Sequence, residues 1–161
     1  MEFWQTITAT LIGGLITLFA TMITNRYQIK REQNKRKIEK IEYSYLLTSK
    51  IDHIYQMHWA SDFASLKSGK YFDEYRVMEK IPFDELAMLI AFYVPELKPK
   101  VAQLITLTQS EYGQIKVRIN SIEETTPQER ETLLFSLNVK YNEIKACISE
   151  LQNCLIECAK I

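Results

Sequence analysis

The chain has 161 residues, and its 20 basic and 20 acidic side chains give a formal net charge of zero at neutral pH. A neutral chain lacks the excess of Lys and Arg that broad binding to nucleic acid requires, which argues against that class of protein. Only four glycines and four prolines occur, and no segment sustains an alternation of apolar and polar residues. These features predict an all-α fold.

The first predicted element is an uncharged run of 21 residues, 3–23. A helix needs roughly 20 apolar residues to cross the hydrocarbon core of a bilayer. A cleaved signal peptide is the weaker alternative, because the run is longer than a signal peptide's apolar stretch and no basic residue precedes it. We therefore expect residues 1–25 to form a transmembrane helix.

Small and polar residues gather on one side of this predicted span, opposite Leu15 and Phe19. Such a stripe suits close packing between helices in lipid, where small residues and hydroxyls drive association. It also suits a ring of helices that turns its hydroxyls toward a water-filled lumen. A threonine can instead satisfy its hydroxyl on its own helix, at the carbonyl four residues before it. The sequence favours packing between copies over the other two. At about 100° per residue, the stripe comprises Thr6, Thr10, Gly13, Gly14, Thr17, Thr21 and Thr24.

A basic cluster, residues 26–40, follows the run and carries a net charge of +5 despite Glu32 and Glu39. Lys and Arg beside a span prefer the cytoplasmic side, which predicts a single-pass protein of the bacterial inner membrane with its N-terminus outside. Basic residues beside anionic headgroups also hold the helix exit at the membrane surface. Residues 41–161 carry a net charge of −4, so no direct contact with nucleic acid is expected. The members of this basic neck are Arg26, Lys30, Arg31, Lys35, Arg36, Lys37 and Lys40.

Residues 26–161 are expected to form one cytoplasmic helical bundle, with the basic neck as its juxtamembrane part. No proline occurs in residues 2–66 and no glycine lies between Gly14 and Gly69, which predicts that the span continues as one long helix until a break at residues 68–70. A short helix is predicted over 71–81, and a second one from Pro82 to Tyr93. Pro95 then suits the first turn of a helix that extends to about residue 122.

The last helix has both a start signal and a heptad pattern. Thr126, Pro127 and Glu129 have the positions of an N-cap, a first helical residue and the acid of a capping box. The heptad predicts knobs-into-holes packing, within the monomer's own bundle in preference to packing between subunits. Its members are Leu134, Leu137, Tyr141, Ile144, Ile148, Leu151, Leu155 and Cys158.

The residues of the usual catalytic and metal sites are missing. No phosphate-binding loop, HExxH or CxxC sequence occurs. His53 and His58 are five residues apart on one predicted helix, so they point to different faces, and we expect them to complete an aromatic layer. The three cysteines, all after residue 146, are interpreted as small apolar side chains and not as metal ligands. We expect no enzyme activity, no cofactor and no metal.

One N-terminal span, a basic neck and a small all-helical cytoplasmic domain together resemble the small membrane proteins encoded beside Cas13b in type VI-B CRISPR systems. The resemblance covers architecture and size along the whole chain. It implies an oligomeric membrane pore that reinforces antiphage defence after RNA-triggered activation. It also implies a divergent HEPN ribonuclease motif, an arginine followed a few residues later by a histidine. That motif is absent, because Arg36 lies far before His53 and no histidine follows Arg76.

The favoured function is a self-assembling single-span membrane protein that forms a pore or otherwise permeabilises the membrane, as an antiphage effector would. Its partners would be copies of itself, for example in a ring, and anionic lipid headgroups. The alternative is a membrane-anchored adaptor whose acidic bundle docks a cytosolic protein. A weaker alternative, implied by the resemblance alone, is a membrane-tethered ribonuclease.

Overall fold

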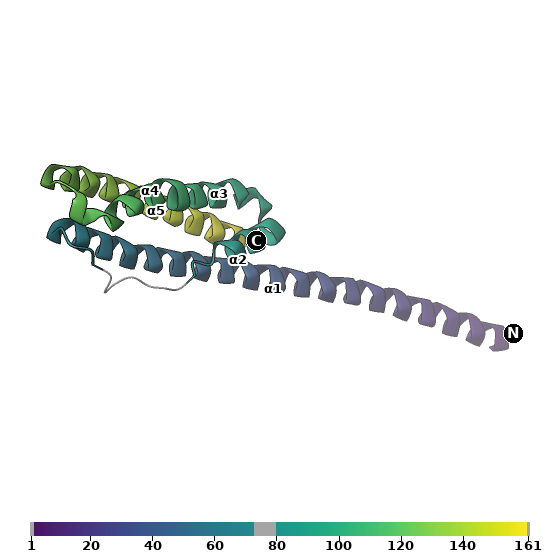
Figure 1. Ribbon diagram of the computed structural model, residues 1–161. Helices are drawn as coiled ribbons and strands as arrows, with labels where there is room; N and C mark the ends of the chain where they lie inside the picture. The colour runs from purple at the N-terminus through teal and green to yellow at the C-terminus, as the bar shows by residue number, and fades with distance from the viewer. Residues whose placement is uncertain (1, 73–79, 161) are drawn as a thin grey trace. The chain divides into compact units, whose positions relative to one another are not determined.

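The computed structural model is all-helical, which confirms the predicted fold class (Figure 1). It describes the backbone of residues 2–72 and 80–160, and the side chains of these residues except 2, 4–6 and 8–11. No strand occurs in this described part of the chain. The elements are α1 (Glu2–Ser68), α2 (Phe83–Tyr93), η1 (Pro95–Leu97), α3 (Lys98–Thr106), η2 (Leu107–Glu111), α4 (Tyr112–Asn120), η3 (Ile122–Glu124) and α5 (Pro127–Ala159).

Contacts between residues divide the chain into two units, 1–39 and 40–161. The first unit consists of the N-terminal part of α1, and the second contains the rest of α1 and every later element. The boundary therefore falls at the end of the basic neck. The domain limits predicted from the sequence, 1–25 and 26–161, stay predictions.

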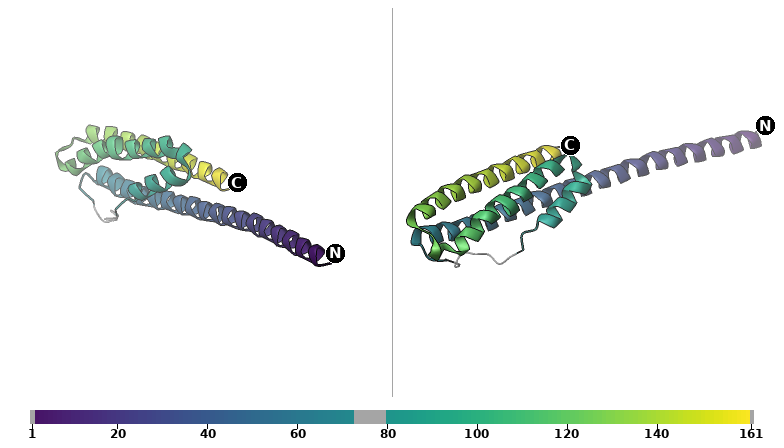
Figure 2. Two further views of the ribbon diagram at one scale, coloured as in Figure 1. Left: turned by 90° about the vertical axis from the view of Figure 1, so that its right-hand side faces the viewer. Right: turned by 45° about the horizontal axis from the view of Figure 1, so that its top comes forward.

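The second unit is a helical bundle in which its part of α1, the run from α3 to α4, and α5 lie side by side (Figure 2). Apolar side chains from all of these helices and from α2 meet in one core. Each large side chain buried there stabilises the unit by about 1.5–3 kcal/mol. Core residues with at most 1% exposure include Ile51, Leu86, Ile90, Leu104, Ile119, Leu137 and Ile148.

The run after Pro95 differs from the single helix predicted to end near residue 122. The structure breaks it into η1, α3, a π-helical turn at η2, α4 and η3. Leu104, Thr108 and Tyr112 follow one another in two steps of four, which on an ideal α-helix would carry the buried stripe about 80° around the axis. The wider π turn, in which the N–H of Tyr112 bonds the carbonyl of Leu107, keeps Tyr112 on the buried side. The Thr108 hydroxyl also donates to the carbonyls of Leu104 at 2.7 Å and Ile105 at 3.0 Å.

The predicted break after α1 is confirmed. Gly69 has a φ of +68°, and its N–H donates to the carbonyl of Ser65 at 2.9 Å, which ends the helix. The N–H of Phe72 donates to the Ser65 hydroxyl at 2.8 Å, so the chain leaves α1 along its own last turns. The short helix predicted over 71–81 is not present at residues 71–72 or 80–81, and residues 73–79 lie outside the described residues.

The predicted starts of the later helices are confirmed. α2 begins at Phe83, directly after Pro82, and Pro95 is the first residue of η1. At α5 the Thr126 hydroxyl accepts from the N–H of Glu129 at 3.3 Å, while the N–H of Thr126 donates to the Glu129 carboxylate at 2.8 Å. This capping box lowers the pKa of Glu129, mainly through the backbone N–H of Thr126.

Gly69→Ala should lower the free energy of unfolding by about 1 kcal/mol or more. Alanine disfavours a positive φ, and its β-carbon would overlap the Arg130 side chain, which must then move. Urea unfolding of the detergent-solubilised full-length protein, followed by circular dichroism, measures the change.

Gly113→Ala is the matched control for this prediction. Gly113 lies inside α4, and nothing lies within 4 Å of a β-carbon added there. Alanine should therefore raise the free energy of unfolding by about 0.5–1 kcal/mol. Equal losses of stability in the two variants would contradict the role of Gly69 in ending α1.

Candidate functional site

The N-terminal unit contains a helical stretch whose apolar side chains are uncovered. From Ile12 to Ile29 every large apolar side chain is more than half exposed, from 55% at Leu15 to 74% at Tyr27. Exposing one such side chain instead of burying it forfeits about 1.5–3 kcal/mol. Over the whole stretch the loss is on the order of 10–20 kcal/mol, which is comparable with the stability of a typical domain. Within the described part of the N-terminal unit, nothing covers these side chains.

The structure gives the predicted transmembrane helix no support. Among the residues that it describes, no helix is both long enough and apolar enough to cross a membrane. The run 3–23 is only partly among them, because the side chains of residues 4–6 and 8–11 are not described. The span and the single-pass topology stay predictions.

The threonines of the predicted stripe bond to their own helix. The hydroxyls of Thr17, Thr21 and Thr24 donate to the carbonyls four residues before them, at 2.8, 2.8 and 2.9 Å. Their protons are therefore used within α1, while each hydroxyl oxygen can still accept a hydrogen bond. Gly13 and Gly14 have open space where a β-carbon would be. The side chains of Thr6 and Thr10 lie outside the described ones.

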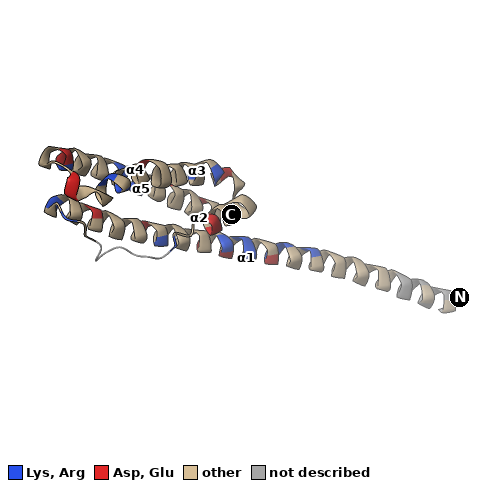
Figure 3. Ribbon diagram, viewed as in Figure 1, with Lys and Arg blue, Asp and Glu red and all other residues tan. Residues whose placement is uncertain are grey.

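The basic neck is exposed along most of its length. Figure 3 shows Lys and Arg as blue segments of α1. Only Lys37 among its members is half-buried. Lys35 lies 4.0 Å from Glu39, and both side chains are more than half exposed. A pair of this kind contributes little to stability, so these charges are available to a surface or a partner.

The α5 heptad is used inside the second unit. Leu137, Ile144, Ile148, Leu151 and Leu155 are buried in the core of the bundle. The other three members, Leu134, Tyr141 and Cys158, are half-buried and pack against that core. Few heptad side chains are left for a second copy of the chain.

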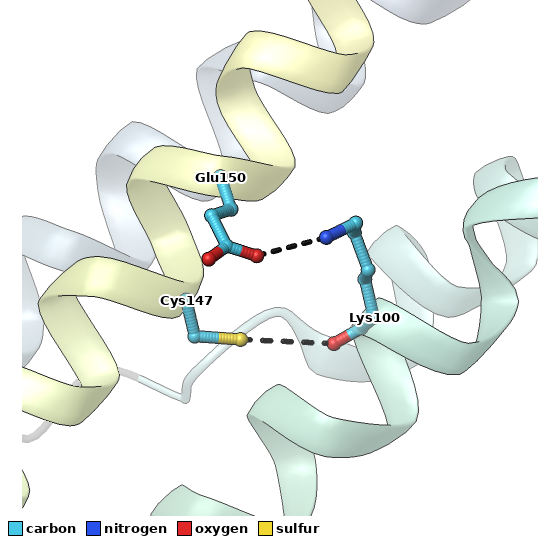
Figure 4. A network of polar contacts seen from close by, with 3 residues as sticks. All are labelled: Lys100, Cys147 and Glu150. Carbon is cyan, nitrogen blue, oxygen red and sulfur yellow. Dashed lines mark hydrogen bonds and ion pairs between the residues drawn. The ribbon is translucent and has the colours of Figure 1, made fainter.

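A polar network joins α3 to α5 beside the first cysteine (Figure 4). The Lys100 ammonium lies 2.8 Å from the Glu150 carboxylate, and the Cys147 sulfur lies 3.9 Å from the Lys100 carbonyl oxygen. Burial raises the pKa of the Cys147 thiol, which keeps it protonated and weakly nucleophilic. Cys154 and Cys158 are half-buried on the same helix, and none of the three cysteines forms a disulfide bond. In the described part of the chain, no three His, Cys, Asp or Glu side chains are grouped as metal ligands would be.

The two histidines occupy different environments. His58 is buried with its ring edge-on to Tyr55, at 6.0 Å between centroids, whereas His53 is exposed. Farther along α1, Trp59 stacks on Tyr141 at 5.0 Å, and its indole N–H donates to the Asn138 side chain at 3.1 Å. His58 thus belongs to an aromatic layer between α1 and its neighbours.

A buried hydrogen bond between α1 and α4 was not predicted from the sequence. The Tyr112 hydroxyl donates to the Asp62 carboxylate at 2.7 Å, and both residues are at most 2% exposed. Asp62 lies on the face of α1 that also buries Tyr55 and His58. Its helical spacing from these two residues is the sequence signal that could have predicted its burial. A buried carboxylate needs hydrogen-bond donors, and the π turn orients Tyr112 so that its hydroxyl supplies one to Asp62.

An apolar groove opens between α1 and α5 at one end of the bundle, with a volume of about 270 Å³. Leu46 and Ile156 on its walls are 62% and 43% exposed. The sequence did not predict it, because it forms where two distant segments meet. The other lining residues are Ile41, Glu42, Tyr45, Leu155 and Ala159.

No protein-family model, curated protein or solved structure matches this chain. The fold and these surfaces are therefore the basis for any proposal about function.

Tyr112→Phe should lower the free energy of unfolding by about 1–3 kcal/mol. The substitution removes one buried donor to the Asp62 carboxylate and changes no apolar contact. Urea unfolding followed by circular dichroism measures the loss.

Tyr43→Phe is the matched control, because the Tyr43 hydroxyl also donates to a carboxylate, Glu85 at 2.9 Å, but at an exposed position. Water can replace that bond, so stability should change by less than about 0.5 kcal/mol. Similar losses in the free energy of unfolding for the two substitutions would contradict a larger contribution from the buried Tyr112–Asp62 bond.

Proposed function

We propose that the chain is a membrane-anchored protein that self-assembles through its N-terminal helix. The exposed apolar stretch from Ile12 to Ile29 carries the proposal, because a bilayer supplies the cover that this stretch needs. The basic neck begins where the uncharged run ends, as expected for a helix that leaves the bilayer among anionic headgroups. In this topology the N-terminus is outside and the bundle is in the cytoplasm of a bacterium.

The threonine and glycine stripe supports association between copies. Lipid offers no hydrogen-bond partners, and the hydroxyls of Thr17 and Thr21 already have theirs on their own helix. Such a face can pack closely at Gly13 and Gly14 without leaving a donor unsatisfied. The finer proposal is a ring in which this face lines a pore, with hydroxyl oxygens accepting from water. Permeabilisation in antiphage defence is the role that the resemblance implies for such a ring.

A membrane-anchored adaptor is the second candidate, and the apolar groove between α1 and α5 favours it. The groove could receive an apolar side chain of a cytosolic protein, with the α1 helix serving only as an anchor. A tethered ribonuclease is the weakest candidate, since it depends on the resemblance alone. Loss of function on replacing the exposed His53, with folding retained, would revive it.

Leu15→Lys combined with Phe19→Lys should release the protein from membranes. Each charge placed within a bilayer span costs about 2.5–3.5 kcal/mol on insertion scales. The wild-type protein should stay in the membrane fraction after an alkaline wash, and the variant should appear in the supernatant. Leu46→Lys, at an exposed position of the bundle, is the control that should stay with the membrane. Wild-type protein in the supernatant would contradict the anchor.

Replacing Thr10, Thr17 and Thr21 together by leucine should abolish ion leakage from vesicles that contain the assembled protein. Leucine removes the hydroxyl oxygens that would line the pore. Unchanged leakage with unchanged assembly would rule out a threonine-lined lumen. An unrelated span in place of residues 1–25 separates the two candidates, because an adaptor would keep its activity and a pore would lose it.

A further inference from the structure

The charged residues of the neck are distributed unevenly around the axis of α1. At about 100° per residue, Arg31, Glu32, Lys35 and Glu39 continue the sector that contains Gly13, Gly14 and the threonines. The remaining charges of residues 26–40 lie outside this sector, largely on the side of Leu15 and Phe19. They are all basic, and they are Arg26, Lys30, Arg36, Lys37 and Lys40.

The two sides of the neck therefore suit different neighbours. The side that follows the large apolar residues has a net charge of +5, which matches anionic headgroups next to a lipid-facing surface. The side that follows the stripe has two basic and two acidic residues and no net charge. A lipid surface would gain nothing from this neutral side, whereas a protein surface with matching charges would.

On the neutral side, the basic and the acidic residues lie toward opposite edges of the sector. Arg31 and Lys35 lie toward one edge of the sector, and Glu32 and Glu39 lie toward the other edge. When two parallel helices face each other, the acidic edge of one meets the basic edge of the other. Arg31 and Glu32 differ in height by one residue, about 1.5 Å, so copies at the same depth in a membrane can pair.

We propose that this charged face of the neck, Arg31, Glu32, Lys35 and Glu39, docks against the same face of a second copy of the chain. The inference rests on the proposed self-assembly and extends its interface from the stripe into the neck. The matching edges of opposite charge select a second copy as the occupant, and they align parallel neighbours in register.

Contacts within one helix leave these charges accessible. Lys35 and Glu39 are 4.0 Å apart, at the limit of an ion pair, and their side chains are 78% and 56% exposed. A Lys that precedes a Glu by four residues is also the less favourable order on a helix. A neighbour's carboxylate or ammonium can therefore join or replace this pair at little cost.

Charge reversal and charge exchange in the full-length protein test the interface. Glu32→Lys with Glu39→Lys places four basic residues on the face, and the association constant should fall about 10-fold. Arg31→Glu with Lys35→Glu should weaken association to a similar extent. The variant that carries all four substitutions exchanges the two edges and should assemble like the wild type. Sedimentation in detergent over a dilution series measures the association constant.

Lys30→Glu with Lys37→Glu is the matched control, because it reverses two charges on the opposite side of the helix and should leave assembly unchanged. A monomeric wild-type protein would overturn both the self-assembly and this interface. Assembly that survives either reversal, or that the fourfold exchange fails to restore, would overturn the interface and leave self-assembly standing.

Discussion

The uncovered apolar side chains of α1 constrain what the N-terminal unit can do. From Ile12 to Ile29 every large apolar side chain is more than half exposed. Covering them would gain on the order of 10–20 kcal/mol, which is comparable with the stability of a typical domain. In the proposed assembly, lipid and other copies cover this stretch, and the arrangement of polar residues around α1 determines which side meets which neighbour.

The second unit buries most of its apolar side chains in one core, although Leu46, Phe92, Val117 and Phe135 are more than 60% exposed. Five of the eight members of the α5 heptad are buried in that core, and the other three are half-buried against it. In the proposed assembly, close contact between copies falls to the N-terminal unit, where the described part of the stripe and the charged face of the neck are exposed. The groove beside Leu46 and Ile156 is the observation that favours an adaptor role.

Local signals predicted the fold well. The capping box at Thr126, the proline starts and the glycine break after Ser68 all act within a few residues, and all were found. The π turn was not predicted. It corrects a shift of the buried residues around the helix axis, and only tertiary packing shows which side must stay buried. The Tyr112–Asp62 bond was missed for a similar reason, since fifty residues separate its partners. On the stripe, Thr17, Thr21 and Thr24 bond to their own helix, which is compatible with all three alternatives, so the choice among them stays a prediction.

The oligomeric mass of the full-length protein in detergent, compared with that of a chain beginning at Asn25, tests whether the N-terminal helix brings the copies together. We expect a discrete assembly of several copies for the full-length protein and a monomer for the shorter chain, because the bundle buries most of its own heptad. A full-length monomer, or the same assembly in both proteins, would show that the N-terminal helix does not bring the copies together.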